Sequence, residues 1–95
     1  MAIYEIQGQH GAYTLDISGR DEWALRQLIA AGQKGCTPID NPAPRWSAYI
    51  HKLRRMGIDI ETVDERHGGP FPGRHARYVL HSLVRALEAQ HGEAA

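Results

Sequence analysis

The side chains most able to bind a metal ion or to catalyse a reaction are thinly spread along this chain. Its 95 residues contain six histidines and a single cysteine, Cys36. None of them shows the paired spacings of zinc sites, such as H-x-x-x-H or C-x-x-C. The sequence also contains no phosphate-binding glycine loop and no nucleophile-elbow motif. We therefore expect no metal, no cofactor and no enzymatic activity.

Two catalytic arrangements remain as alternatives. Cys36 with a distant histidine is the one available nucleophile pairing, but a lone cysteine is more often a small buried apolar group. Asp59 and Glu61 form a possible carboxylate pair on one face of a predicted strand. An exposed strand face explains that pair better than acid–base chemistry does.

The charges of the chain are balanced in number but segregated in position. Lys and Arg total 11, as do Asp and Glu, so a uniformly basic protein that coats nucleic acid is excluded. Residues 43–58 and 66–87 contain cations and no acid, whereas residues 59–65 are rich in acids. We expect the eight cations of the two basic stretches to lie side by side on one positive surface: Arg45, Lys52, Arg54, Arg55, Arg66, Arg74, Arg77 and Arg85.

The clearest predicted helix covers residues 45–56. Its apolar residues recur at spacings of three and four, so they share one buried face: Trp46, Tyr49, Ile50, Leu53 and Met56. The remaining surface offers cations, a hydroxyl and small or planar side chains: Arg45, Ser47, Ala48, His51, Lys52, Arg54 and Arg55. Such a surface suits the major groove of DNA, with residues 45–52 near bases and the last two arginines near phosphates. Alternatively, cations near a helix C-terminus favour the helix dipole and solubility without any partner.

A second basic element follows the acidic stretch. Residues 58–65 and 74–82 read as two strands, and residues 66–73 between them are a loop with three glycines and two prolines. His67, Arg74 and Arg77 are expected to follow the DNA backbone or to enter the minor groove. We expect Phe71 to fold back on the core, with contact to a partner as the alternative.

The other elements complete a recognisable order. Residues 1–17 predict a β-hairpin, residues 20–31 a helix, and residues 83–90 a short last helix capped by Ser82. We expect Trp23 to pack on another layer, such as the hairpin. Three prolines allow at most one helical turn, capped by Thr37, between the two longer helices.

This order predicts an α+β fold, a winged helix-turn-helix with an N-terminal hairpin, a shortened second helix, a two-stranded wing and a short C-terminal helix. The length of 95 residues indicates a single domain. Within it, residues 1–17 form the hairpin, 20–82 the winged-helix core and 83–95 the last helix and tail. We also expect a cytoplasmic protein, because the sequence shows no apolar run of membrane-spanning length and no secretory signal.

Three segments carry a resemblance to a known family. They are GCTPIDNPAPRWSAYIHKLRR at 35–55, GIDIETV at 57–63 and HGGPFPGRHARYVL at 67–80. Residues 22–84, which contain them, resemble small winged-helix domain proteins of alphaproteobacteria and their prophages. The resemblance implies a winged-helix fold and DNA binding, and it names no operator or pathway.

We therefore predict a non-enzymatic protein that binds double-stranded DNA, either as a small transcription regulator or as a phage-derived accessory factor. About five phosphate contacts would give log K a slope of about −4 to −5 against log salt. One alternative is a protein-interaction domain of the same shape without DNA binding. A second is a dimerisation module that uses the N-terminal hairpin and the last helix as its interface.

Overall fold

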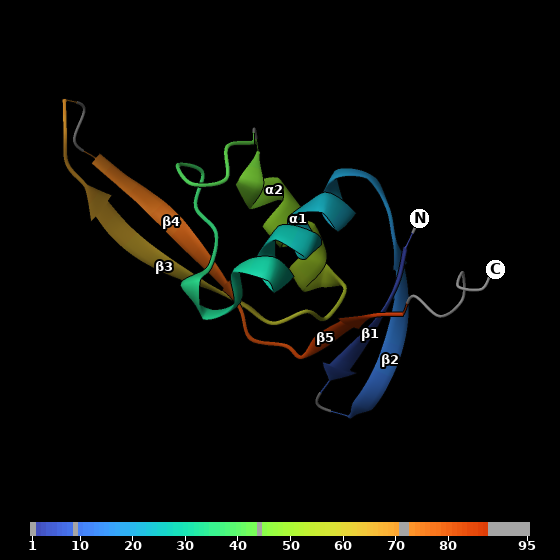
Figure 1. The fold of residues 1–95 in the computed structure, drawn as a ribbon. Helices are drawn as coiled ribbons and strands as arrows, with labels where there is room; N and C mark the ends of the chain where they lie inside the picture. The colour runs from blue at the N-terminus through green and yellow to red at the C-terminus, as the bar shows by residue number, and fades with distance from the viewer. Residues whose placement is uncertain (1, 9, 44, 71–72, 88–95) are drawn as a thin grey trace.

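The computed structural model describes residues 2–8, 10–43, 45–70 and 73–87. It contains an N-terminal three-stranded sheet, two α-helices and a separate two-stranded sheet (Figure 1). In chain order the elements are β1 Ala2–Gly8, β2 Gly11–Ile17, α1 Gly19–Ala31, the 3-10 turn Gly32–Lys34, α2 Trp46–Arg55, β3 Ile60–His67, β4 Gly73–Leu80 and β5 Val84–Ala86. Within these ranges, neither helix combines the length and hydropathy that crossing a bilayer requires.

The predicted N-terminal hairpin is confirmed. β1 and β2 pair antiparallel without interruption from Ala2↔Ile17 to Gly8↔Gly11. Tyr4 and Ile6 are buried whereas Glu5 between them is less so, which is the alternation expected of a strand with one covered face. The helices supply that cover, since they lie between the hairpin and the β3–β4 sheet (Figure 1).

The predicted C-terminal helix is wrong for the part of it that the structure describes. Val84–Ala86 forms strand β5, which pairs antiparallel with β1 in the order β2-β1-β5. The backbone groups of β1 explain the difference, because Gln7 N–H donates to Leu83 O and Ile3 O accepts from Leu87 N–H. A helix here would leave that edge of β1 unpaired. Ser82, the expected helix cap, instead accepts a hydrogen bond from Asp59 N–H through its Oγ.

The segment between the two helices confirms the single turn that the prolines permit. Asn41 N–H donates to Thr37 O, closing one turn, and Thr37 Oγ1 accepts from Ile39 N–H and Asp40 N–H. Just before this turn, Cys36 forms an antiparallel bridge with Tyr78 of β4. The short segment is therefore held by the two-stranded sheet rather than by a helix of its own.

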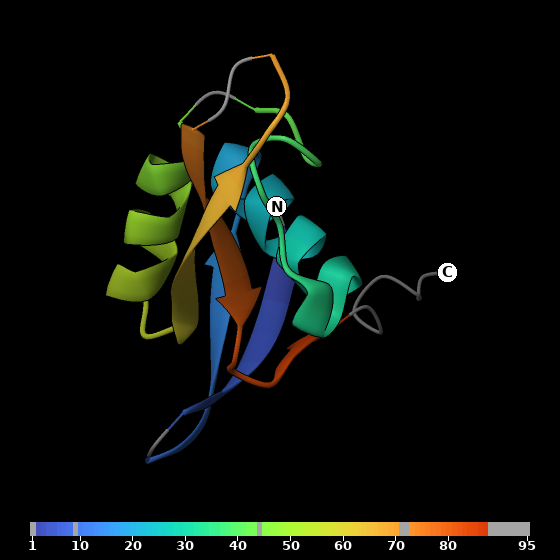
Figure 2. The ribbon, with the colours of Figure 1, turned by 90° about the vertical axis from the view of Figure 1, so that its left-hand side faces the viewer.

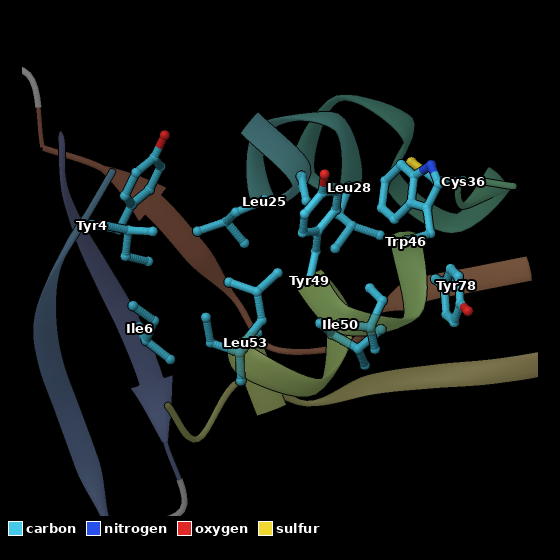
Figure 3. Close-up of a cluster of buried hydrophobic side chains, with 14 residues drawn as sticks. Tyr4, Ile6, Leu25, Leu28, Cys36, Trp46, Tyr49, Ile50, Leu53 and Tyr78 are labelled. Atoms are coloured by element: carbon cyan, nitrogen blue, oxygen red, sulfur yellow. The ribbon is translucent and has the colours of Figure 1, made fainter. Parts of the chain in front are cut away.

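Trp46, at the start of α2, is the centre of an aromatic cluster in the core (Figure 3). Its ring stacks on Tyr78 of β4 at a centroid distance of 5.9 Å and meets Trp23 of α1 at 5.6 Å. Its indole N–H donates to Asn41 O in the proline-rich turn, at 2.7 Å. Trp23 thus packs on another element, as expected, and its partner in this cluster is Trp46 of α2. The predicted position of Phe71 lies outside the described residues.

The C-terminal end of α2 is tied to the hairpin. Ile58 N–H donates to Leu53 O and Gly57 N–H to Arg54 O, which is the Schellman pattern of a helix end. Gly57 has the left-handed φ of 91° that this pattern needs. Tyr13 of β2 donates its hydroxyl to Met56 O at 2.9 Å, so the hairpin closes over the last turn of α2.

Replacing Gly57 should test that junction. In Gly57→Ala the new Cβ would lie 2.6 Å from Tyr13 Oη, in addition to the backbone strain of a left-handed alanine. We expect a loss of about 2–3 kcal/mol in the free energy of unfolding, measured in urea. Gly69→Ala is the matched control, since Gly69 has φ 95° and nothing within 4 Å of its Cβ position. Equal losses in the two variants would contradict the role of Tyr13.

Candidate nucleic-acid interface

The outer face of α2 is basic and free of acids. Its buried face consists of Trp46, Tyr49, Ile50 and Leu53. The predicted groove-facing residues lie on the remaining surface, where all are exposed except the half-buried Ala48: Arg45, Ser47, Ala48, His51, Lys52, Arg54 and Arg55. Figure 2 shows α2 at one side of the wing strands with α1 at the other, so that no described segment covers this face.

Three cations on this face have no partner among the described residues. Arg45, Lys52 and Arg55 make no ion pair or side-chain hydrogen bond with any residue that the structure describes. Arg45 also has a left-handed φ of 68°, and its carbonyl accepts from Ala48 N–H and Tyr49 N–H at the start of the helix. A non-glycine residue in this conformation carries strain of the kind that is found at functional sites.

Arg54, also predicted as a phosphate contact, is used within the protein. Its Nη2 donates to Ile60 O at 2.7 Å and to Thr62 Oγ1 at 2.6 Å, and its Nε donates to Ile60 O at 3.1 Å. These bonds join the last turn of α2 to the first residues of β3. The arginine therefore fixes the angle between the helix and the wing.

The wing, defined as β3, β4 and the loop between them, has two different faces. The strands pair from Ile60↔Leu80 to His67↔Gly73. By strand alternation, Arg66 and Arg74 share the face of Tyr78, whose ring stacks on Trp46 of α2. Arg74 is bound to Asp64, whereas Arg66 has no partner among the described residues.

The opposite face of the wing holds a chain of paired side chains. Arg77 donates through Nε to Glu65 Oε2 at 2.6 Å and through Nη1 to Lys34 O at 2.8 Å. The other oxygen of Glu65 lies 3.1 Å from His75 Nε2, and His75 Nδ1 lies 2.9 Å from His67 Nδ1. The hydrogen bond from Arg77 holds the pKa of Glu65 below its usual value.

The expectation that eight cations form one positive surface is therefore wrong. Arg74 and Arg77 are paired with wing acids, Arg54 with the backbone of β3, and Arg85 with Glu5 in the N-terminal sheet. Of the eight, the described structure leaves four without partners: Arg45, Lys52, Arg55 and Arg66. Of the other four, Arg74 and Arg77 pair with carboxylates of the intervening stretch, whereas Arg54 binds Ile60 O and Arg85 binds Glu5.

The Glu65–His75–His67 arrangement was not predicted from the sequence. The register of the two wing strands would have revealed it, because Glu65 lies directly opposite His75. Residues 66–73 were expected to form a loop, and their composition does not define that register. In the structure β3 continues to His67 and β4 begins at Gly73.

Catalytic and metal-binding alternatives gain no support from the described side chains. No group of three or more His, Cys, Asp or Glu in the described ranges is arranged to hold a metal ion. Cys36 is fully buried, and this burial raises the pKa of its thiol. The reactive thiolate form is therefore disfavoured.

The architecture agrees with that of a known family. A family profile described as a winged helix domain matches residues 14–90. The chain belongs to the winged helix domain family. Searches of curated proteins and of solved structures returned no match. The matched part of the winged helix domain begins within β2, so that β1 precedes it.

The paired face of the wing should make stability depend on pH. The lowered pKa of Glu65 means that its ionised form stabilises the folded state above the unfolded-state pKa near 4.5. This contribution is lost as the pH falls through the lower, folded-state pKa. We expect Glu65→Gln to be less stable than wild type at pH 7, and the difference to vanish in strong acid.

Urea unfolding between pH 2 and 7 measures this effect. Arg77→Ala is the matched control, because it removes the same hydrogen bond from the other side. The double variant should lose little more than the worse single variant. A stability difference that stays constant down to pH 2 would contradict the pairing.

Proposed function

We propose that this winged helix domain binds double-stranded DNA, with α2 in the major groove and Arg66 at the phosphate backbone. The observation that carries the proposal is a set of cations on the outer face of α2 that have no partner among the described residues, namely Arg45, Lys52 and Arg55. The protein forms ion pairs at many of its other arginines. Cations left unpaired on one acid-free helix face are suited to displacing the counterions of a polyanion.

The dimensions and chemistry of α2 support this placement. A helix is about 10–12 Å across with its side chains, and the major groove is about 12 Å wide. His51 and Ser47 offer hydrogen-bonding groups between the cations, and Ala48 offers a methyl group that fits against thymine. Base reading would therefore come from the first two turns of α2.

The wing contributes less direct contact than its arginine content suggests. Arg66 shares the face of the wing that packs on α2, and no residue that the structure describes pairs with it. His67 and Arg77 lie on the other face, where Arg77 is bound to Glu65 and to Lys34 O. We therefore propose that His67 and Arg77 hold the shape of the wing, and that Arg66 contacts a phosphate.

Regulation of transcription is the role that we propose for this binding. A small domain of neutral net charge that carries one basic face is suited to reading a site rather than coating DNA. The resemblance of residues 35–55 and 67–80 to proteins of alphaproteobacteria and their prophages supports a bacterial or phage-related regulator.

Charge reversal on α2 tests the proposal. The double variant Lys52→Glu with Arg55→Glu changes two exposed side chains that bind no other described residue, and it changes no buried one. We expect its affinity for a labelled mixed-sequence duplex to fall by about 100-fold, at about tenfold for each reversed contact. Fluorescence anisotropy at low salt gives the binding constant.

A matched control has the same change in net charge. Arg20→Glu with Lys34→Glu reverses two exposed cations on α1 and the 3-10 turn, away from the outer face of α2. This variant should retain most of the wild-type affinity. Equal loss in both variants would mean a non-specific charge effect. Wild-type affinity in the α2 variant would reject the groove assignment.

A further inference from the structure

We propose that two copies of this chain associate through the outer edge of β2, pairing antiparallel about a two-fold axis at Thr14. The inference concerns a second surface of the molecule and does not rest on DNA binding. It follows from the backbone groups of β2, from the way the other strand edges are protected, and from the register that self-pairing would adopt.

The outer edge of β2 presents backbone groups that no described residue uses. In β1, Ile3 and Gln7 direct their backbone groups toward β5, since Ile3 O accepts from Leu87 N–H and Gln7 N–H donates to Leu83 O. Tyr4 and Ile6 therefore face β2 and pair with Leu15 and Tyr13. The intervening residues of β2 point their N–H and C=O groups to the outside: Ala12, Thr14 and Asp16.

The other edges of the described sheets carry protection that β2 lacks. On β4, Cys36 pairs with Tyr78 at the outer edge, and Arg74 and Arg77 add charge. β5 is only three residues long. On β3, Ile60 O faces away from β4, because Asp59 O accepts from His81 N–H, and the guanidinium of Arg54 covers it. The rest of β3 carries four charged side chains along its length: Glu61, Asp64, Glu65 and Arg66. Short length and charge are the usual protections against edge-to-edge pairing.

β2 has none of these protections over seven residues. It contains no proline, no lysine and no break in its register with β1, and its one charged residue is Asp16. An uninterrupted edge of this kind is a template for another strand. A second copy of β2 is a partner of matching length that every solution of the protein contains.

Self-pairing has one register that suits both backbone and side chains. Centred on Thr14, it places Ala12 of each copy opposite Asp16 of the other, so that all three outward-facing residues pair and the two carboxylates stay apart. On the core-facing side it places Tyr13 opposite Leu15, an aromatic–aliphatic pair. Centred on Asp16, the two carboxylates would face each other at close range.

The resulting dimer is isologous, with one six-stranded sheet that runs through both copies. If DNA binding also holds, the recognised site is an inverted repeat.

Sedimentation velocity tests the dimer. Wild type should sediment as a dimer that dissociates on dilution, whereas Thr14→Lys should remain monomeric, because two ammonium groups would meet at the axis. Gln7→Lys is the matched control: it adds the same charge to the same sheet, on β1, which is paired on both sides. Gln7→Lys should dimerise as wild type does. A wild-type monomer at all concentrations would overturn the inference.

Cross-linking tests the register. Directly opposed residues in a hydrogen-bonded antiparallel pair have Cα atoms about 5.5 Å apart, within the range of a disulfide. Thr14→Cys should therefore form a covalent dimer on oxidation, while Gln7→Cys and the buried Cys36 should not. A dimer in which Thr14→Cys fails to cross-link would reject this interface. DNA binding by a strictly monomeric protein would reject the dimer and leave the proposed function standing.

Discussion

The packing of Trp46 is the constraint on which the rest of the structure depends. The residue is 3% exposed, and its ring lies against an aromatic residue of α1, of β4 and of α2 itself. Its N–H is satisfied by Asn41 O, which fixes the proline-rich turn against the same ring. Because Trp46 contacts three elements, α2 can adopt only one orientation about its long axis. Once Trp46 faces inward, the cations of α2 must face outward.

The two ends of α2 are then fixed by separate contacts. At the C-terminal end, Tyr13 of the hairpin and Arg54 of the helix bind backbone carbonyls on either side of the turn into β3. Ion pairs within the wing neutralise Arg74 and Arg77. The fold thus sorts its arginines into those that hold the helix and wing together and those that remain available to an external anion. Net charge, which is zero, conveys nothing of this division.

Most elements could be predicted from local patterns, because those patterns are strong. The apolar spacing of α2, the alternation in the hairpin and the glycine-rich loop of the wing each indicate their structures without reference to distant residues. β5 could not be predicted in this way, because Val84–Ala86 becomes a strand only through its pairing with β1, some 80 residues earlier. The ion pairs of the wing could not be predicted from the sequence for a related reason. Asp64 and Glu65 reach Arg74 and Arg77 across the sheet, and the partner of each depends on a register that the loop composition leaves open.

The salt dependence of duplex binding tests the division of the arginines most directly. Each phosphate contact contributes a slope of about −0.9 to log K against log salt. Contact through Arg45, Lys52, Arg55 and Arg66 alone predicts a slope of about −3.6 for each bound chain. A slope near −7 would mean that the paired arginines also reach phosphates and that the ion pairs open on binding. A slope near zero would mean that the outer face of α2 does not contact DNA, which would contradict the proposed role of its unpaired cations.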